Sequence, residues 1–251
     1  MKLGALLGPI VDAAQGEILA EQARTYSGEG YDSLWSVQAI GRGFMITDPF
    51  ITLAVAASVA RDVEIGTAIV QVPLYQPMDL AHRVLSLRQI CGDRLLLGVG
   101  AGSTEQDFIA FGRDYDARFG AFDEAMVELR QIFSTGGNGV SALSPWPAMA
   151  GGLPLFLGTW GAGVERAAHE FDGWIASGAN RTVEQLSDTI ARYRGAGGGR
   201  AIVSTVQLGG DCDLGELQDR LDHYAEAGFD DVVVMILPGG PRAADVRRLV
   251  D

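Results

Sequence analysis

Groups that carry metal, disulfide or imidazole chemistry are scarce in this sequence. It contains two cysteines, Cys91 and Cys212, and neither belongs to a Cys-x-x-Cys pair or to a metal-ligand spacing. Both are therefore expected to be small buried residues rather than disulfide or zinc partners. The three histidines, His82, His169 and His223, fall within predicted outer helices, where surface or packing roles are usual. The chemistry of the protein is therefore expected elsewhere in the chain.

Positive charge and long apolar runs are scarce as well. The formal net charge of −13 at pH 7 disfavours nucleic acids and anionic membrane surfaces as partners, because their phosphates require clustered lysine and arginine. No apolar run reaches the roughly 18 to 20 residues that a membrane span needs. The apolar part of the N-terminus is too short for a secretory signal. These features predict a soluble cytoplasmic protein.

The length and the order of the predicted elements indicate the fold. A chain of 251 residues with 47% hydrophobic residues fits a single domain over residues 1–251. Three helix-to-strand junctions repeat one theme, as expected for an iterated unit: Gly30-Tyr31-Asp32, Phe171-Asp172-Gly173 and Gly228-Phe229-Asp230. Eight strand-then-helix units predict a closed TIM (β/α)8 barrel, with a doubly wound open sheet as the alternative.

Periodicity and capping residues predict the elements. Strands are expected over residues 2–7, 31–36, 63–70, 94–99, 154–158, 173–177, 201–208 and 232–237. Helices are expected over residues 16–28, 48–61, 77–90, 119–133, 162–170, 182–194, 213–227 and 241–250. Asp48-Pro49 predicts a capped helix start, and Thr182 with Gln185 forms a capping-box pattern. Two apolar stripes predict core faces: Leu80, Val84, Leu87, Ile90; and Phe119, Phe122, Met126, Leu129, Phe133.

Two glycine-rich junctions follow predicted strands. In the first, Gly98, Gly100 and Gly102 leave one face of the strand end without side chains, which either lets a flat ligand approach or makes room for tight packing. In the second, residues 158–163 join a strand to a helix whose N-terminus favours an anion. This second element matches neither the dinucleotide fingerprint nor a Walker loop. Both junctions lie where a barrel places its active site.

One stretch carries a family resemblance. Gly98-Val99-Gly100-Ala101-Gly102, Asp107-Phe108, Phe111-Gly112-Arg113-Asp114 and Arg118 resemble the corresponding segment of the bacterial luciferase-like superfamily. Members are flavin- or deazaflavin-dependent oxidoreductases on a TIM barrel, and they often pair as homodimers. The resemblance implies that the 158–163 turn and Arg118 hold the cofactor phosphate. It also implies a non-prolyl cis peptide near Ala68-Ile69, behind the cofactor ring.

The resemblance and the predicted strand ends together define the candidate site. The candidate catalytic residues are Gln38 and Glu105, with Asp107 as a further acid that handles protons or is simply solvated. The candidate cofactor-binding residues are Trp35, Ala68, Ile69, Gly100, Gly102, Arg118, Gly158, Thr159, Trp160 and Gly161. Trp35, Phe44, Trp146 and Trp160 line an apolar substrate pocket or belong to the core.

Two departures from the family pattern leave the reaction open. Many flavin monooxygenases of the family have a histidine shortly after the second strand, whereas this chain reads Trp35-Ser36-Val37-Gln38-Ala39 there. Ala101-Gly102 stand where bacterial luciferase has an arginine. The leading interpretation is a monooxygenase that uses FMN, as FMNH2 with O2, on a small organic substrate. The alternatives are hydride transfer with coenzyme F420, a non-catalytic flavin-binding protein, and a barrel with unrelated chemistry.

Overall fold

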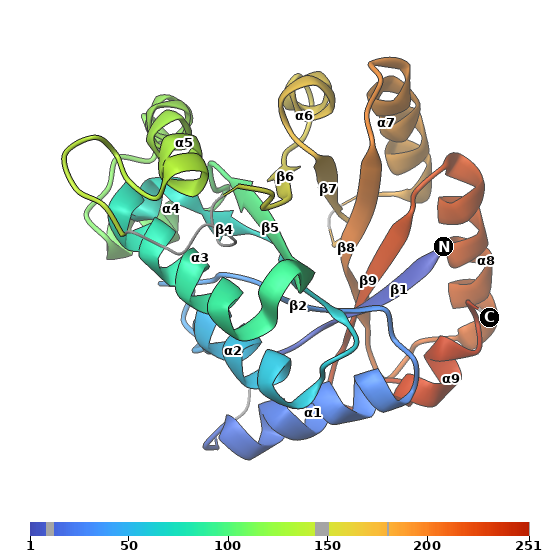
Figure 1. The fold of residues 1–251 in the computed structure, drawn as a ribbon. Helices are drawn as coiled ribbons and strands as arrows, with labels where there is room; N and C mark the ends of the chain where they lie inside the picture. The colour runs from blue at the N-terminus through green and yellow to red at the C-terminus, as the bar shows by residue number, and fades with distance from the viewer. Residues whose placement is uncertain (9–12, 144–150, 180, 251) are drawn as a thin grey trace.

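The protein folds as a closed barrel of parallel strands surrounded by helices (Figure 1). The computed structural model describes residues 1–8, 13–143, 151–179 and 181–250. The strand order is β3-β2-β1-β9-β8-β7-β6-β5-β4, and an additional pairing of β3 with β5 closes the ring. The predicted TIM barrel is therefore confirmed, and the open-sheet alternative is wrong.

The strands and helices alternate along the chain. The strands are β1 (Lys2–Leu6), β2 (Ser33–Ser36), β3 (Glu64–Thr67), β4 (Val70–Gln71), β5 (Leu95–Gly100), β6 (Leu155–Gly158), β7 (Gly173–Ser177), β8 (Arg200–Leu208) and β9 (Asp231–Ile236). The α-helices are α1 (Gly16–Gly28), α2 (Pro49–Val59), α3 (Pro77–Cys91), α4 (Glu105–Ala110), α5 (Arg118–Thr135), α6 (Gly163–Glu170), α7 (Val183–Gly195), α8 (Leu214–Ala227) and α9 (Ala243–Arg247). No helix in the described parts of the chain is long and apolar enough to cross a membrane.

The capping signals act as predicted. The Asp48 carboxylate accepts from the amides of Phe50 at 2.9 Å and Ile51 at 3.3 Å, which begins α2 with Pro49 in its first turn. Thr182 and Gln185 bond reciprocally at the start of α7. These two starts fix where the chain leaves a loop and enters the outer layer.

Two elements differ from expectation. The predicted third strand is interrupted, because the Ala68–Ile69 peptide between β3 and β4 is cis, as the resemblance implies. The short helix α4 replaces a predicted loop. Its six residues are too few for a recognisable hydrophobic period.

Two residues of the predicted apolar stripes face solvent. Ile90 is 52% exposed, because Cys91, which is 4% exposed, continues the buried face of α3. Phe119 is 61% exposed, because it lies in the first turn of α5, before the helix packs on the strands through Phe122. Cys212 is half-buried rather than buried. The three histidines are exposed on α3, α6 and α8, as predicted.

The core has two layers that follow from the alternation of side chains along each strand. Outward-facing residues pack against the helices, and inward-facing residues fill the barrel. The inner cluster, called here the middle layer, consists of Leu6, Trp35, Leu96, Phe156, Ile175, Ile202 and Val233. It separates the N-terminal floor of the barrel from its C-terminal mouth.

The floor is closed by ion pairs between the first residues of three strands. The Arg200 guanidinium donates to both oxygens of Glu64, at 2.8 and 2.6 Å, and to both oxygens of Asp231, at 2.7 and 2.6 Å. The Asp231 side chain is fully buried, and burial raises its pKa although Arg200 opposes the shift. For Glu64, burial is outweighed by the bonds from Arg200, so its pKa is lowered. These two bidentate ion pairs of Arg200 join β3 to β8 and β9.

Replacing Arg200 should destabilise the barrel strongly. Arg200→Met leaves Asp231 buried without its partner, and such a change costs about 3 to 5 kcal/mol of unfolding free energy. Urea unfolding followed by circular dichroism measures this loss. The matched control is Arg242→Met, since the Arg242 side chain is 77% exposed and pairs with Asp245, three residues along the chain. Equal unfolding midpoints for the two variants would contradict the role of the floor.

Candidate active site at the barrel mouth

The mouth of the barrel lies above the middle layer, at the C-terminal ends of the strands. All strand pairings are parallel, so every strand ends at this side. Four half-buried residues pack on the middle layer from the mouth side: Val37, Ala68, Ile69 and Met235. Together they form an apolar surface at the mouth on which a flat ligand could rest.

The glycines of β5 and β6 make room for neighbouring chain segments. A Cβ on Gly98 would lie 2.0 Å from the Thr67 carbonyl oxygen. A Cβ on Gly100 would lie 3.0 Å from Ile69 Cδ1, and one on Gly158 would lie 2.5 Å from Ile69 Cγ2. Of the two interpretations of this glycine pattern, tight packing is the one that the structure supports. The surface open to a ligand is then Ile69 itself, held over Gly100 and Gly158.

Trp35 lies inside the barrel rather than at its mouth. Its side chain is fully buried, and its indole N–H donates to Ser33 Oγ at 2.7 Å, one step toward the floor. A Cβ on Gly66 would lie 2.3 Å from the indole ring, so the glycine gives the ring its space. Trp35 therefore supports the mouth from below, and its ring offers no surface to a ligand.

A polar network joins the ends of β2 and β4 to α4. The backbone N–H of Gln71 donates to Gln38 Oε1 at 2.8 Å, and Gln38 Nε2 donates to the Tyr75 hydroxyl at 2.6 Å. Gln71 Nε2 donates to Asp107 Oδ2 at 2.7 Å. The Arg42 guanidinium pairs with the same carboxylate, with Nε 2.9 Å from Oδ1. Three loops that lie far apart in the sequence are thereby held together at one side of the mouth.

Asp107 is the centre of this network and not a solvated carboxylate. It is fully buried, and it also accepts from the Ile40 amide at 3.1 Å. Burial alone would raise its pKa, but the hydrogen bonds from Arg42, Gln71 and Ile40 outweigh burial, so the pKa is lowered. The residue is ionised near neutral pH and holds the loop after β2 onto α4.

The two candidate catalytic residues have different surroundings. Gln38 is 6% exposed, and its oxygen and nitrogen are both bonded within the network, so its orientation is fixed. Glu105 is exposed in the first turn of α4. Burial raises the pKa of Tyr75, the partner of Gln38, to about 12. Its hydroxyl therefore stays protonated at neutral pH.

The turn between β6 and α6 has the features of an anion site. The helix begins at Gly163 after Ala162, which provides no side-chain cap, and the amides of Gly163 and Val164 make only long bonds to the Trp160 and Gly161 carbonyls, at 3.4 and 3.3 Å. Gly161 has a left-handed backbone, with φ +63°. A Cβ on Gly163 would lie 2.2 Å from Thr159 Oγ1, which places this hydroxyl at the helix start. The guanidinium of Arg181 covers the half-buried Trp160 ring at 4.5 Å.

Arg118 lies at the start of α5, the helix beside α6. Two side-chain contacts join the helices: Arg166 pairs with Asp123 at 2.5 Å, and Arg130 donates to the Glu170 carbonyl at 2.7 Å. The earlier residue of α5 pairs with the earlier residue of α6, so the two helices run in the same direction. Arg118 is half-buried, because its guanidinium stacks on Tyr115 at 3.7 Å. Its Nη1 donates to the Tyr115 carbonyl, whereas its Nε is buried without a partner among the described residues.

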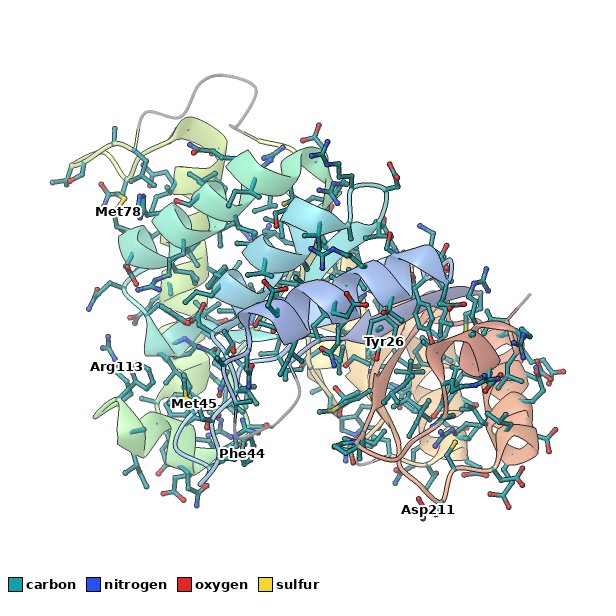
Figure 2. The ribbon with its side chains drawn as sticks, turned by 90° about the horizontal axis from the view of Figure 1, so that it is seen from below. Tyr26, Phe44, Met45, Met78, Arg113 and Asp211 are labelled. Carbon is teal, nitrogen blue, oxygen red and sulfur yellow. The ribbon has the colours of Figure 1, made fainter. Side chains whose placement is uncertain are left out.

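The aromatic candidates for a substrate pocket separate. Trp35 belongs to the core, Trp160 is half-buried beside α6, and Trp146 lies outside the described residues. Phe44 is 42% exposed and Met45 is 79% exposed, on the loop after β2. Figure 2 labels these two residues next to each other in the lower left part of the view, with Asp211 in the lower right part.

Sequence reasoning missed Arg42, and it missed the contact between Gln71, which follows the third predicted strand, and Asp107. Arg42 is 65 residues from Asp107, and Gln71 is 36 residues from it, so no local spacing signals the contact. The available signal is position alone, because Gln38 and Gln71 both follow the ends of predicted strands that neighbour in a barrel.

Comparison with known proteins agrees with this geometry. A family model described as luciferase-like monooxygenase matches residues 7–209 of the chain. The 4-hydroxyprotoasukamycin monooxygenase of Streptomyces nodosus subsp. asukaensis is 28% identical over 172 residues, which are 62% of this chain and 46% of that protein. The chain thus spans less than half the length of this relative.

Solved structures share the fold over nearly the whole chain. The monooxygenase RslO1 from Streptomyces bottropensis matches with a TM-score of 0.79 at 19% identity, covering 99% of this chain and 97% of that chain. An F420-dependent secondary alcohol dehydrogenase in complex with an F420-acetone adduct matches with a TM-score of 0.79 at 15% identity and the same coverage. At these identities the likeness shows the fold alone.

Neutralising Asp107 should loosen the mouth in a pH-dependent way. In Asp107→Asn, the new amide nitrogen faces the donors of Arg42 and Gln71, so the unfolding free energy at pH 7 should fall by about 2 to 3 kcal/mol. The folded-state pKa of Asp107 is lowered, so its contribution is present above the unfolded pKa of about 3.9 and is lost as the pH falls through the folded pKa. The gap between variant and wild type should therefore begin to narrow as the pH falls below about 4.

Denaturant unfolding at a series of pH values measures this gap. Asp79→Asn is the matched control, because Asp79 is half exposed and pairs with Arg83 within one helix. A gap for Asp107→Asn that is absent at pH 7, or that stays constant down to pH 3, would contradict the ion-pair account.

Proposed function

The chain belongs to the luciferase-like monooxygenase family, and from this premise we propose that it uses a reduced flavin, FMNH2 with O2, to oxygenate a small organic substrate. The bound flavin would supply the redox chemistry. The residues at the mouth would bind and orient it, keep water from the reacting face and hold the substrate. The curated relative is a monooxygenase, which supports this class of reaction.

One observation carries the proposal: the Nε of Arg118, at the start of α5, is buried and has no hydrogen-bond partner among the described residues, and the neighbouring helix α6, joined to α5 by side-chain pairs, begins without a side-chain cap. A buried guanidinium N–H without an acceptor is costly in an isolated chain. A phosphate group provides the acceptor oxygens, and a helix N-terminus together with an arginine is a recurrent phosphate site. The residues present therefore fit the cofactor phosphate. Arg118, Thr159, Gly161 and the first amides of α6 would hold it.

The remaining candidate residues would act on the ring and the substrate. Ala68 and Ile69 form the apolar surface above the middle layer on which the ring would rest, with Gly100 and Gly158 against Ile69. Gly102 lies instead against Gln71 and Phe108, on the side of the Asp107 network. Gln38 would hold its carboxamide toward the mouth as a fixed hydrogen-bonding group. Glu105, exposed at the rim, would exchange protons with solvent.

Hydride transfer with coenzyme F420 is the second candidate, and the absence of an imidazole favours it. All three histidines lie exposed on outer helices, and Gln38, which cannot act as an acid or base, follows β2. Oxygen activation by a flavin gains from a nearby acid or base, whereas hydride transfer depends mainly on alignment. The similarity in fold to the F420-dependent alcohol dehydrogenase is compatible with this alternative.

Binding distinguishes these alternatives from each other and from a flavin-storage protein. Fluorescence titration of the chain with FMN and with F420 identifies the preferred cofactor. Turnover of the reduced, preferred cofactor with and without O2 then separates oxygenation, hydride transfer and mere storage. Self-association, which the resemblance implies, stays a prediction that sedimentation can test. Absence of binding to both cofactors would overturn the proposed function.

Replacing Arg118 should weaken FMN binding through the phosphate alone. Arg118→Ala removes a charge-assisted hydrogen bond worth about 1.5 to 3 kcal/mol, so the Kd for FMN should rise about ten- to a hundredfold. Riboflavin, which lacks the phosphate, should bind both proteins with nearly equal Kd. The measurement is fluorescence titration of both ligands into both proteins. Equal losses for the two ligands would mean that Arg118 shapes the loop through its stacking on Tyr115.

A further inference from the structure

Thr205 has a backbone conformation that its residue type avoids. Its φ is +60°, and it is the one non-glycine residue with positive φ among those that the structure describes. Glycine occupies all the other left-handed positions in the described chain, such as Gly102 and Gly161. A β-branched side chain in this region is strained, and such residues concentrate at functional sites.

The strain coincides with a bulge in β8. Val203 pairs with Val232 and Val206 pairs with Val234, so Ser204 and Thr205 together face the single residue Val233 of β9. A bulge of this kind adds one residue to a strand and changes the direction of a side chain, often beside an active site. Thr205 is the half-buried member of the pair and the one closer to the C-terminal end.

The flanking residues show that Thr205 is on the barrel side of the strand. Val203 and Val206 both pack in the outer core, against the helices. Between them, Ser204 is 3% exposed, and its hydroxyl donates to the Ala176 carbonyl at 3.2 Å. Thr205 Oγ1 lies 3.4 Å from Ser204 Oγ, which is long for a bond between hydroxyls. The Thr205 hydroxyl is therefore available to another acceptor.

The neighbouring strand ends add two uncharged polar groups. Ser177 follows the outward-facing Ala176 on β7, and Gln207 lies between the outward-facing Val206 and Leu208 on β8, so both point to the mouth. Both are exposed, and neither side chain has a hydrogen-bond partner among the described residues. These strand ends of β7 and β8 contrast with the network of Asp107, where the donors and the carboxylate are already hydrogen-bonded.

We propose that Thr205 is a substrate-binding residue which, with Ser177 and Gln207, hydrogen-bonds a neutral carbonyl or hydroxyl oxygen of the organic substrate. The inward-facing side chains at the ends of β7, β8 and β9 carry no charge, so an anionic or cationic substrate group would lack a counter-charge there. The inference rests on the proposed function and adds the chemical class of the substrate.

The strain is tested first, by stability. Thr205→Gly adopts the left-handed conformation without a Cβ clash, so its thermal midpoint should lie about 2 to 4 °C above that of wild type. Thr205→Asn, a residue that tolerates this region, should also rise, whereas Thr205→Val should match wild type. A lower midpoint for Thr205→Gly than for wild type would overturn the assignment of strain.

The ligand class is tested with four probes that share a six-membered ring: cyclohexanone, cyclohexanol, cyclohexanecarboxylate and cyclohexylammonium. Saturation-transfer NMR titration with the full chain measures their affinities. The two neutral compounds should bind wild type, and Thr205→Val, which lacks the hydroxyl, should bind them about three- to tenfold more weakly. Equal affinity for wild type and Thr205→Val would overturn the proposal. Stronger binding of a charged probe, or no binding of either neutral probe, would also overturn it.

A cofactor titration keeps this result separate from the proposed function. Thr205→Val and wild type should bind FMN, or F420, with the same Kd, because the residue is assigned to the substrate. A weakened cofactor affinity in Thr205→Val would place the residue against the cofactor and overturn its substrate role. Failure of wild type to bind either cofactor would overturn the proposed function, whatever the ring probes show.

Discussion

The ion pairs of Arg200 at the N-terminal end of the barrel are the interaction on which the layers above depend. A closed parallel barrel must fill its interior, and here the lowest layer is polar rather than apolar. Arg200 meets this constraint by satisfying Glu64 and the buried Asp231 with paired hydrogen bonds. Trp35 and the rest of the middle layer pack above these ion pairs, and the residues at the mouth pack on the middle layer.

The same stacking explains the glycines. Each inward position of β5 above Leu96 is a glycine, because Thr67 and Ile69 occupy the space that side chains would take. The indole of Trp35 requires Gly66 in the same way. Glycine in this barrel therefore marks close approach between chain segments. An exposed ligand surface arises only one step later, where Ile69 covers the glycines and faces the mouth.

Local signals in the sequence predicted most of the fold. Strand and helix alternation, the Asp48 cap and the Thr182 capping box depend on neighbouring residues, so periodicity and spacing reveal them. The break between β3 and β4 depends on tertiary packing, and α4 is shorter than two helical turns, so neither has a periodic signature. The prediction that Phe119 and Ile90 are buried was wrong, because helix ends extend beyond the surface that the helix covers.

The candidate site was predictable in position but not in its division of roles. Strand ends and the α6 turn follow from the barrel, whereas the Arg42–Asp107 pair and the bulge at Thr205 arise from contacts across the sequence. The structure leaves the two sides of the mouth unlike. On the side of β2, β4 and α4, the Gln71 carboxamide bonds the buried Asp107 carboxylate, and the Gln38 carboxamide bonds the Gln71 backbone and Tyr75, so these contacts hold the loops.

On the side of β7, β8 and β9, the polar side chains are uncharged, and those of Ser177 and Gln207 have no hydrogen-bond partner among the described residues. Ser204 is bonded to the Ala176 carbonyl, and Thr205 has only its long contact with Ser204. A side whose polar groups are already bonded provides rigidity, because displacing them would leave a buried charge unpaired. A side whose polar groups are open provides recognition, because a ligand gains their bonds without breaking others. Thr205 belongs to the second side. Its backbone conformation is strained for threonine and favours glycine, but glycine would offer no hydroxyl to a ligand.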